Sequence, residues 1–160
     1  MADRRYWLFK SEPGAYSFSD LQNEEDRTAE WDGVRNYRAR NLMRDQMKVG
    51  DGVLFYHSST AVPAVVGTAH VVRESYPDDT AWEPTSRYYD PKASPDNPVW
   101  CMVDIQADAE LPRPVTLREI KDNPKLDGML LVRRGMRLSI QPVTREEWDE
   151  ILGMSRSGPL

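Results

Sequence analysis

The sequence predicts an α+β fold, and three observations support this class. Runs with strand character occur in both halves of the 160 residues, single helical patterns separate them, and a long proline-rich segment interrupts the order. The irregular spacing argues against a doubly wound parallel sheet. A small mixed barrel with helices packed outside fits the pattern, although the strand order does not follow from it. A chain of this length is expected to form one domain over residues 1–160, with a substantial core.

The N-terminal third begins with a strand. The segment "RRYWLFKSE" (4–12) alternates two sets of side chains and is rich in aromatic residues, which is typical of a strand. Ser17 can cap a short helix over 17–23, because Asp20 follows three residues later. Apolar residues then recur at helical spacing, which predicts an amphipathic helix over 36–47.

Strand patterns dominate the middle of the chain. The segments 53–58 ("VLFYHS") and 64–72 ("AVVGTAHVV") both predict strands, and Gly67 indicates a bulge or a close backbone approach. Residues 76–98 contain five prolines and predict a long irregular loop, a feature that is often functional. The segment 99–106 ("VWCMVDIQ") predicts a further strand.

The last third combines helices with one strand. A Thr-x-x-Glu capping box predicts that a helix begins at 116–120 ("TLREI"). The segment 130–135 ("LLVRRG") predicts the end of another helical segment, stopped by Gly135. Residues 137–143 predict a strand, and a second capping box predicts a helix over 144–154.

The charge is unevenly distributed. The net charge is −5, yet residues 35–48 carry +4 and residues 133–137 carry +3, which leaves −12 for the remaining chain. An acidic body argues against diffuse binding to nucleic acid, but two basic segments are compatible with a local phosphate-binding patch. Alternatively, these cations form solvated faces that pair with nearby acids.

Several classes of site are disfavoured. The single cysteine, Cys101, excludes an internal disulfide and is expected to fill the core. His57 and His70 lack the clustered spacing of a zinc site, so neither a metal nor a cofactor is expected. The chain shows no nucleophile motif and no phosphate-binding glycine loop, which argues against an enzyme.

The chain also lacks membrane and targeting signals. No apolar run approaches the roughly 20 residues of a membrane helix, and no leader opens the sequence. We therefore expect a cytoplasmic monomer with no membrane partner.

Aromatic and amide residues beside positive charge suggest a site for a nucleic-acid base. An extruded base needs aromatic walls, donors and acceptors for its edge, and cations for the flanking phosphates. Trp31 can supply a wall and Asn36 can contact the edge, because an amide both donates and accepts. Alternatively, Trp31 is a core anchor at the start of the helix, and Asn36 is its N-cap.

Eight segments of the chain, in order, strongly resemble EVE-domain proteins. They are "YWLFKSEP" (6–13), "YSFSDL" (16–21), "WDGVRNYRARN" (31–41), "KVGDGVLFYHS" (48–58), "VVRESYPD" (71–78), "YYDPKASPDNPVWCMVDI" (88–105), "LPRPVTLREIK" (111–121) and "LVRRGMRLSIQPVTREEW" (131–148). The resemblance implies a PUA-like fold, which is a small, mixed, partly open β-barrel flanked by helices. It also implies kinship with YTH domains, which bind methylated adenine of RNA in an aromatic cage.

The resemblance further implies a non-catalytic module that recognises a flipped, modified base, either a modified cytosine in DNA or a methylated base in RNA. The matching motifs nominate eleven residues for base binding: Lys10, Ser11, Glu12, Trp31, Arg35, Asn36, Tyr37, Asn41, Tyr56, His57 and Ser58. Arg38 and Arg40 are the cations expected to contact the flanking phosphates, and the matching segment around "RRG" nominates Arg133 and Arg134 for further phosphate contacts. The further cage walls have three candidates, Tyr56, Trp82 and Tyr88.

Two other functions remain open at this point. The proline-rich loop over 76–98 could bind a protein partner. An enzyme acting on a modified nucleotide or RNA could use Glu12 or His57 as its acid or base.

Overall fold

The computed structural model describes residues 4–157. The strands are β1 (Tyr6–Ser11), β2 (Thr28–Glu30), β3 (Gly52–His57), β4 (Ala64–Pro77), β5 (Cys101–Thr116) and β6 (Ile140–Val143). The α-helices are α1 (Phe18–Gln22), α2 (Tyr37–Asp45), α3 (Leu117–Asp122) and α4 (Arg145–Arg156). Four short 3-10 helices complete the list: η1 (Glu25–Arg27), η2 (Asp79–Trp82), η3 (Pro124–Leu126) and η4 (Leu130–Val132).

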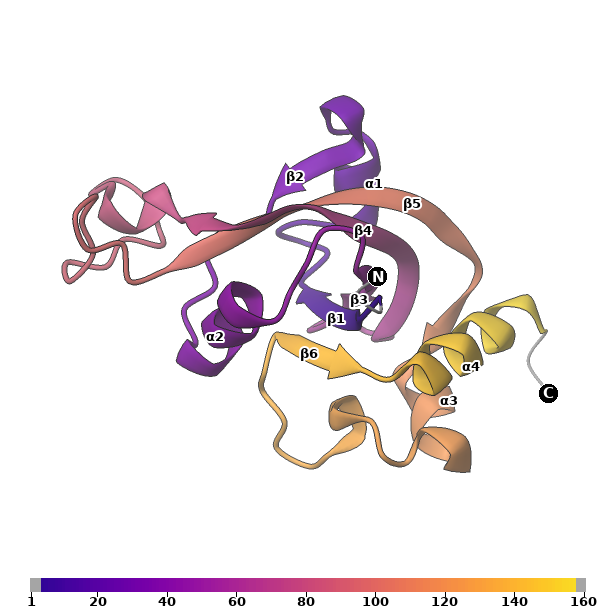
Figure 1. Cartoon of the computed structure of the whole chain (residues 1–160). Coiled ribbons are helices and arrows are strands. Elements are labelled where there is room, and N and C mark those ends of the chain that lie inside the picture. The colour runs from indigo at the N-terminus through magenta and orange to yellow at the C-terminus, as the bar shows by residue number, and fades with distance from the viewer. Residues whose placement is uncertain (1–3, 158–160) are drawn as a thin grey trace.

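The six strands form one mixed sheet in the order β2-β5-β4-β3-β1-β6. β1 pairs in parallel with β3, whereas the other neighbouring strands are antiparallel. The long β4–β5 hairpin curves through the molecule, with α2 near one end and with α3 and α4 near the other (Figure 1). This arrangement confirms the predicted α+β class and the partly open, mixed sheet flanked by helices.

Both faces of the central strands are buried, because alternate side chains enter two different cores. Trp7 and Phe9 of β1 join a first core with residues of α1 and α2. Leu8, between them, joins a second core with residues of α3 and α4. The same alternation on β3 sends Phe55 to the first core and Tyr56 to the second.

The predicted helix starts are confirmed by their side-chain hydrogen bonds. Ser17, Thr116 and Thr144 each cap a helix through a capping box. The side-chain oxygen of Asn36 accepts a hydrogen bond from the backbone N–H of Ala39, so Asn36 is the N-cap of α2.

The strands differ from the predictions mainly in length. β5 continues to Thr116 although it contains Pro112 and Pro114. A proline is tolerated where its missing N–H is not needed for pairing. Both prolines lie beyond the residues that pair with β2, and both lie near a register shift in the pairing with β4. Gly67 lies at that shift, and a Cβ atom there would come within 2.4 Å of the Phe18 ring, so both expectations for this glycine are confirmed. Only three residues of the segment 130–135 are helical.

The predicted loop over 76–98 joins β4 to β5 and projects beyond the sheet as a compact unit (Figure 1). Its first two residues belong to β4, and η2 follows directly. Ala81, Ala93 and Trp100 form a small core of their own. The indole N–H of Trp100 donates to Asp90 at 2.7 Å, so a polar contact also closes the loop.

Candidate nucleic-acid interface

A cavity of about 970 Å³ opens between the end of β1, β2 and the 76–98 loop. We call it the base cavity. Its lining residues are Lys10, Ser11, Glu12, Ala15, Tyr16, Glu24, Glu25, Asp26, Thr28, Ala29, Glu30, Trp31, Asp32, Gly33, Val34, Arg35, Arg87, Tyr88, Asp104 and Ser139. Five of the nominated base-binding residues are therefore brought together here: Lys10, Ser11, Glu12, Trp31 and Arg35.

Trp31 forms an aromatic wall of this cavity and is also anchored in the first core. Its ring centroid lies 5.3 Å from that of Phe9 and 5.6 Å from that of Phe55. Tyr16 contacts it edge-on at 6.0 Å. The ring is half-buried, so it is rigidly supported from below while part of it remains accessible.

Tyr88 provides a second aromatic side chain at the cavity, from a segment far away in the sequence. Its ring lies on Gly33, where an added Cβ atom would come within 2.5 Å of the ring. Gly33 has a φ of +78°, a conformation that also favours glycine. Of the three candidates for a further cage wall, only Tyr88 lines the cavity; Trp82 packs against the small core of the loop.

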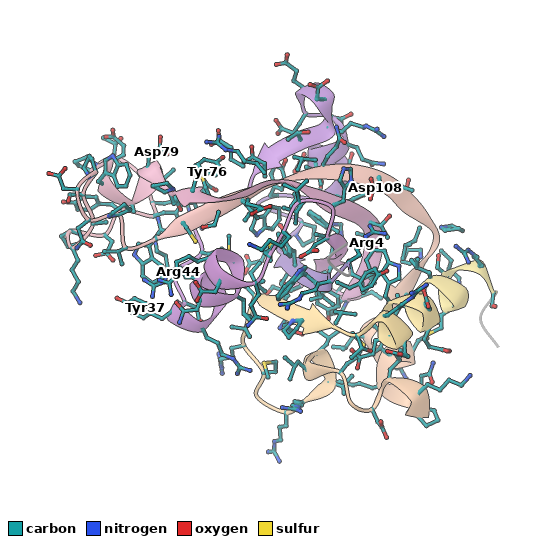
Figure 2. The ribbon with its side chains drawn as sticks, in the orientation of Figure 1. Arg4, Tyr37, Arg44, Tyr76, Asp79 and Asp108 are labelled. Carbon is teal, nitrogen blue, oxygen red and sulfur yellow. The ribbon has the colours of Figure 1, made fainter. Side chains whose placement is uncertain are left out.

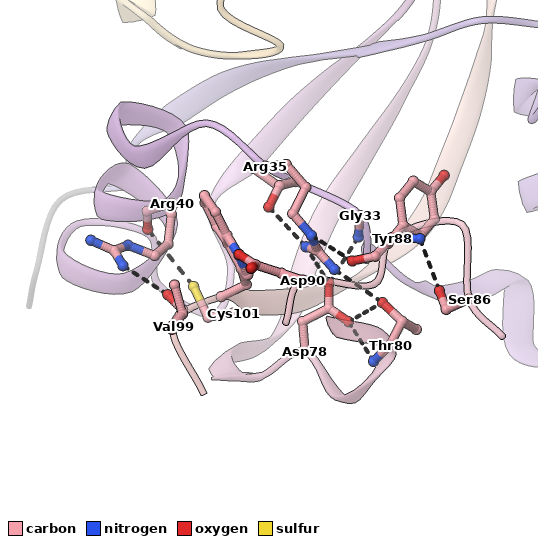
Figure 3. A network of polar contacts seen from close by, with 12 residues as sticks. Gly33, Arg35, Arg40, Asp78, Thr80, Ser86, Tyr88, Asp90, Val99 and Cys101 are labelled. Carbon is pink, nitrogen blue, oxygen red and sulfur yellow. Dashed lines mark hydrogen bonds and ion pairs between the residues drawn. The ribbon is translucent and has the colours of Figure 1, made fainter. Parts of the chain in front are cut away.

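Asp78 is fully buried and joins the segment 33–35 to the start of the 76–98 loop (Figure 3). Its carboxylate accepts hydrogen bonds from the backbone N–H of Gly33 at 2.9 Å and from the Arg35 guanidinium at 3.0 Å. It also accepts from the backbone N–H and the hydroxyl of Thr80. Arg35 donates in addition to the Tyr88 carbonyl, so its guanidinium joins the cavity walls and is not free for a phosphate.

The cavity is rich in carboxylates. Seven acids line it, compared with three cations: Lys10, Arg35 and Arg87. Burial and the charge of Asp78 raise the pKa of Asp32. Burial and the charge of Asp104 raise the pKa of Glu30, and burial lowers the pKa of Lys10. The cavity therefore offers hydrogen-bond acceptors to a polar edge and repels phosphate.

The end of β1 contributes polar groups to the mouth of the cavity. The Lys10 ammonium donates to the Met136 carbonyl at 3.4 Å, which ties β1 to the segment before β6. The Ser11 hydroxyl donates to the Tyr16 carbonyl, and its own carbonyl accepts from the Ser58 N–H at 2.9 Å. Glu12 is exposed at the rim.

The β3 residues nominated for base binding lie elsewhere. Tyr56 is only 3% exposed and packs in the second core, because the alternation of β3 directs it away from the Trp31 side of the sheet. The His57 ring accepts a hydrogen bond from the Phe18 N–H through Nε2 at 3.1 Å, which fixes the start of α1. Ser58 reaches Ser11 only through its backbone.

The α2 residues form a separate surface. The exposed Tyr37 ring stacks on Trp100 at 4.7 Å, and Arg40 lies over Tyr37 at 4.9 Å. Arg40 also donates to the Val99 carbonyl and to Asn41. Tyr37 and Arg44 lie on the opposite side of the β4–β5 hairpin from Tyr76 and Asp79 (Figure 2). Arg38 is exposed and makes no side-chain hydrogen bond within residues 4–157.

Much of the charge on 35–48 is paired, as the alternative interpretation held. Asp78 binds Arg35, Asp45 binds Arg44 at 2.8 Å, and Glu74 binds Lys48 at 3.6 Å. These basic residues therefore form faces that are largely neutralised by local acids.

The second basic segment is different, because it lines a groove of about 450 Å³ that contains no acid. We call it the basic groove. Its cations are Lys121, Arg133, Arg134 and Arg137, and within the described part of the chain their side chains form no ion pair. The same segment continues into the base cavity through Ser139 and contacts Lys10 through Met136, so the two depressions are adjacent.

Among the cavity residues that sequence reasoning missed are Tyr16, Asp32 and Arg87. Asp32 follows Trp31 directly and belongs to the quoted motif "WDGVRNYRARN", so its position was a usable signal. Tyr16 likewise opens the quoted motif "YSFSDL", whereas Arg87 is brought in by packing between distant segments, which no local pattern reveals.

The described residues offer no site of two other kinds. Across residues 4–157, no group of three or more His, Cys, Asp or Glu side chains is placed to hold a metal ion. Among the helices of this range, none has the length and apolar character needed to cross a membrane.

Comparisons with known proteins give consistent matches. The family model described as "EVE domain" matches residues 5–154. Mouse thymocyte nuclear protein 1 is 41% identical over 96% of this chain and 75% of its own length. The structure of human THYN1 in complex with DNA that contains 5-methylcytosine is 40% identical, covers 97% of this chain and 99% of that one, and superposes with a TM-score of 0.91.

A more distant structure supports the fold alone. The YTH domain of Zygosaccharomyces rouxii MRB1, solved with N6-methyladenosine RNA, is 13% identical and has a TM-score of 0.56 over 100% of this chain and 89% of that one. The kinship with YTH domains that the motifs implied is therefore confirmed at the level of the fold.

The relatives contradict the prediction of a cytoplasmic location. The matching proteins from mouse and human are named as thymocyte nuclear proteins, which points to the nucleus. The prediction was wrong because the lack of membrane and targeting signals does not by itself place a protein in the cytoplasm.

Proposed function

Because this chain belongs to the EVE domain family, we propose that it is a DNA-binding module that holds a modified cytosine, extruded from the helix, in the base cavity. The observation that carries the proposal is the half-buried Trp31 ring at the wall of an open cavity of about 970 Å³. The complex of human THYN1 with 5-methylcytosine DNA supports the choice of ligand.

The walls of the cavity suit a flat, methylated ring. Trp31 offers a supported aromatic surface on which a base can stack, and Tyr88 offers a second aromatic side chain. Stacking of one base on an aromatic ring contributes about 1–3 kcal/mol, which alone gives weak binding. The polar groups at the end of β1 would contact the edge of the base.

The remaining affinity would come from phosphates outside the carboxylate-rich cavity. The basic groove is the best-placed partner, because Arg133 and Arg134, which form no ion pair among residues 4–157, adjoin the cavity. Arg87 at the cavity edge and the exposed Arg38 are further candidates. Binding that depends on such contacts weakens as salt rises.

No observation favours the enzyme alternative. His57, its candidate acid or base, already accepts a hydrogen bond that fixes α1. Burial lowers the pKa of His57, which favours the neutral ring that accepts this hydrogen bond.

The proposal can be tested by titrating fluorescently labelled oligonucleotides and following their anisotropy. The panel contains DNA and RNA, each with cytosine, 5-methylcytosine, 5-hydroxymethylcytosine or N6-methyladenine at one position. We expect at least about a tenfold preference for a modified cytosine in DNA, equivalent to about 1.4 kcal/mol. A preference for a methylated base in RNA would identify a different polymer, and equal affinity across the panel would refute modified-base recognition.

Two variants test the role of the cavity. Trp31→Ala should weaken binding of the preferred oligonucleotide by about tenfold or more, and Trp31→Phe should retain part of it. Tyr89→Ala is the matched control, because Tyr89 is 45% exposed and lies outside the cavity lining. Equal affinity of Trp31→Ala and Tyr89→Ala, both folded by circular dichroism, would place the binding site elsewhere.

A further inference from the structure

A cavity that accepts 5-methylcytosine must also exclude thymine. Both pyrimidines carry the same methyl group at position 5, so the methyl contact cannot distinguish them. They differ at position 4, where cytosine presents an amino donor and thymine presents a carbonyl acceptor. A selective site therefore needs a hydrogen-bond acceptor that is fixed beside the stacked ring.

We propose that Asp32 is the residue that selects an amino pyrimidine over a carbonyl pyrimidine in the base cavity. Its carboxylate would accept a hydrogen bond from the 4-amino group of the base. This inference rests on the proposed function, and it assigns the edge contact that decides which 5-methylpyrimidine is retained.

The other carboxylates of the cavity are less suited to this role. Five are exposed at the rim, where water competes for them: Glu12, Glu24, Glu25, Asp26 and Glu30. Asp104 is half-buried but already accepts a hydrogen bond from the Tyr76 hydroxyl. Asp32 is half-buried, and its side chain accepts no hydrogen bond from any other residue among 4–157.

The backbone on both sides of Asp32 is fixed. The Trp31 N–H donates to the Val103 carbonyl at 2.7 Å, and the Gly33 N–H donates to the buried Asp78 at 2.9 Å. The backbone of Asp32 is thus fixed relative to the Trp31 ring. A carboxylate held directly beside a stacking surface can contact the edge of a stacked base in a defined orientation.

The charge of Arg35 acts on Asp32, but Arg35 forms no hydrogen bond or ion pair with it. The Arg35 guanidinium lies against Asp78 at 3.0 Å and donates its other hydrogen bonds to Val34, Thr80 and Tyr88. Asp32 therefore retains its capacity to accept a hydrogen bond. A thymine in the same position would set its O4 atom against this carboxylate, leaving two acceptors in contact.

The test uses four DNA duplexes that differ only in one base: cytosine, 5-methylcytosine, uracil or thymine. The test base is placed opposite an abasic site, so that extruding it breaks no base pair in any duplex. Comparing the two methylated with the two unmethylated bases measures the methyl preference. Comparing the two amino with the two carbonyl bases measures the amino preference.

We expect the wild-type protein to show both preferences, the amino preference being about tenfold or more. Asp32→Asn should reduce the amino preference at least about fivefold, because an amide can turn its NH2 group toward a carbonyl base. The methyl preference should remain. Asp32→Ala should weaken binding of both amino bases without weakening binding of thymine.

Glu30→Gln is the matched control, because it removes one negative charge from the same cavity two residues away. It should leave the amino preference unchanged. An unchanged amino preference in Asp32→Asn, or its loss in Glu30→Gln, would overturn the assignment to Asp32. The absence of a methyl preference in the wild-type protein would instead refute the proposed function, so the two failures are distinguishable.

Discussion

Replacing Asp78 with alanine tests whether one buried carboxylate holds the segment 33–35 against the 76–98 loop. Asp78 is fully buried and accepts four hydrogen bonds, from Gly33, from Arg35 and twice from Thr80. The alanine variant removes all four and leaves the Arg35 guanidinium without its ion-pair partner, although 22% of that side chain is exposed. The two backbone N–H groups also lose their acceptor.

Removing one partner of a buried ion pair costs about 3–5 kcal/mol of the free energy of unfolding. For a chain of this length, each kcal/mol corresponds to roughly 2–4 °C in Tm. We therefore expect Asp78→Ala to lower Tm by roughly 6–20 °C, measured by circular dichroism. Its affinity for the preferred oligonucleotide should also fall at temperatures where it remains folded, because Gly33 and Arg35 position the cavity walls.

Asp45→Ala is the matched control, since Asp45 pairs with Arg44 on the surface, where both side chains are about half exposed. Exposed pairs of this kind contribute little, so no measurable change in Tm is expected. If Asp78→Ala lowered Tm no more than Asp45→Ala does, the contacts of Asp78 with residues 33–35 would not stabilise the fold.

Three further predictions concern other parts of the molecule. Gly33→Ala should destabilise the fold by more than the roughly 1–2 kcal/mol of a left-handed backbone position, because its Cβ also meets an aromatic ring; Gly50→Ala, with a φ of +93° and open space around it, should show only the backbone cost in urea denaturation. The lowered pKa of His57 means that the unfolded chain binds a proton more readily, so stability should fall as pH drops through the ordinary value of 6.5 toward the folded pKa. His57→Gln should flatten this part of the pH profile, and an unchanged profile would contradict the assignment. Replacing both Arg133 and Arg134 with alanine should reduce the slope of log K against log salt for DNA binding by about 1–2 if each contacts a phosphate, whereas an unchanged slope would exclude the basic groove.

The fold could be predicted where the signal is local. The three capping boxes and the Asn36 N-cap depend on residues within one turn, and the structure confirms each of them. The lengths of β4 and β5 depend on pairing between distant segments, which no local pattern reveals. The strand β2 has only three residues, which is too short for an alternating pattern to be detected. It forms because it pairs with the edge of β5.

The site could be predicted only in outline. Trp31 was identified because it stands in a distinctive motif, and the structure places it at the cavity. Tyr56 was grouped with it because it stands in the matching motif "KVGDGVLFYHS", and a motif does not reveal which face of the sheet a side chain occupies. Asp32 was overlooked because the chain contains 26 acidic residues, and only burial and hydrogen bonding distinguish this one.

The placement of β1 has a consequence for how the chain folds during synthesis. β1 lies between β3 and β6, so one of its edges is paired by residues 52–57 and the other by residues 140–143. Until the second of these segments leaves the ribosome, one edge of β1 has no strand to pair with. Contacts between such distant segments form slowly, and an unpaired edge is prone to pair with other chains. A nascent chain stalled before residue 140 should therefore depend on chaperones far more than the released protein does.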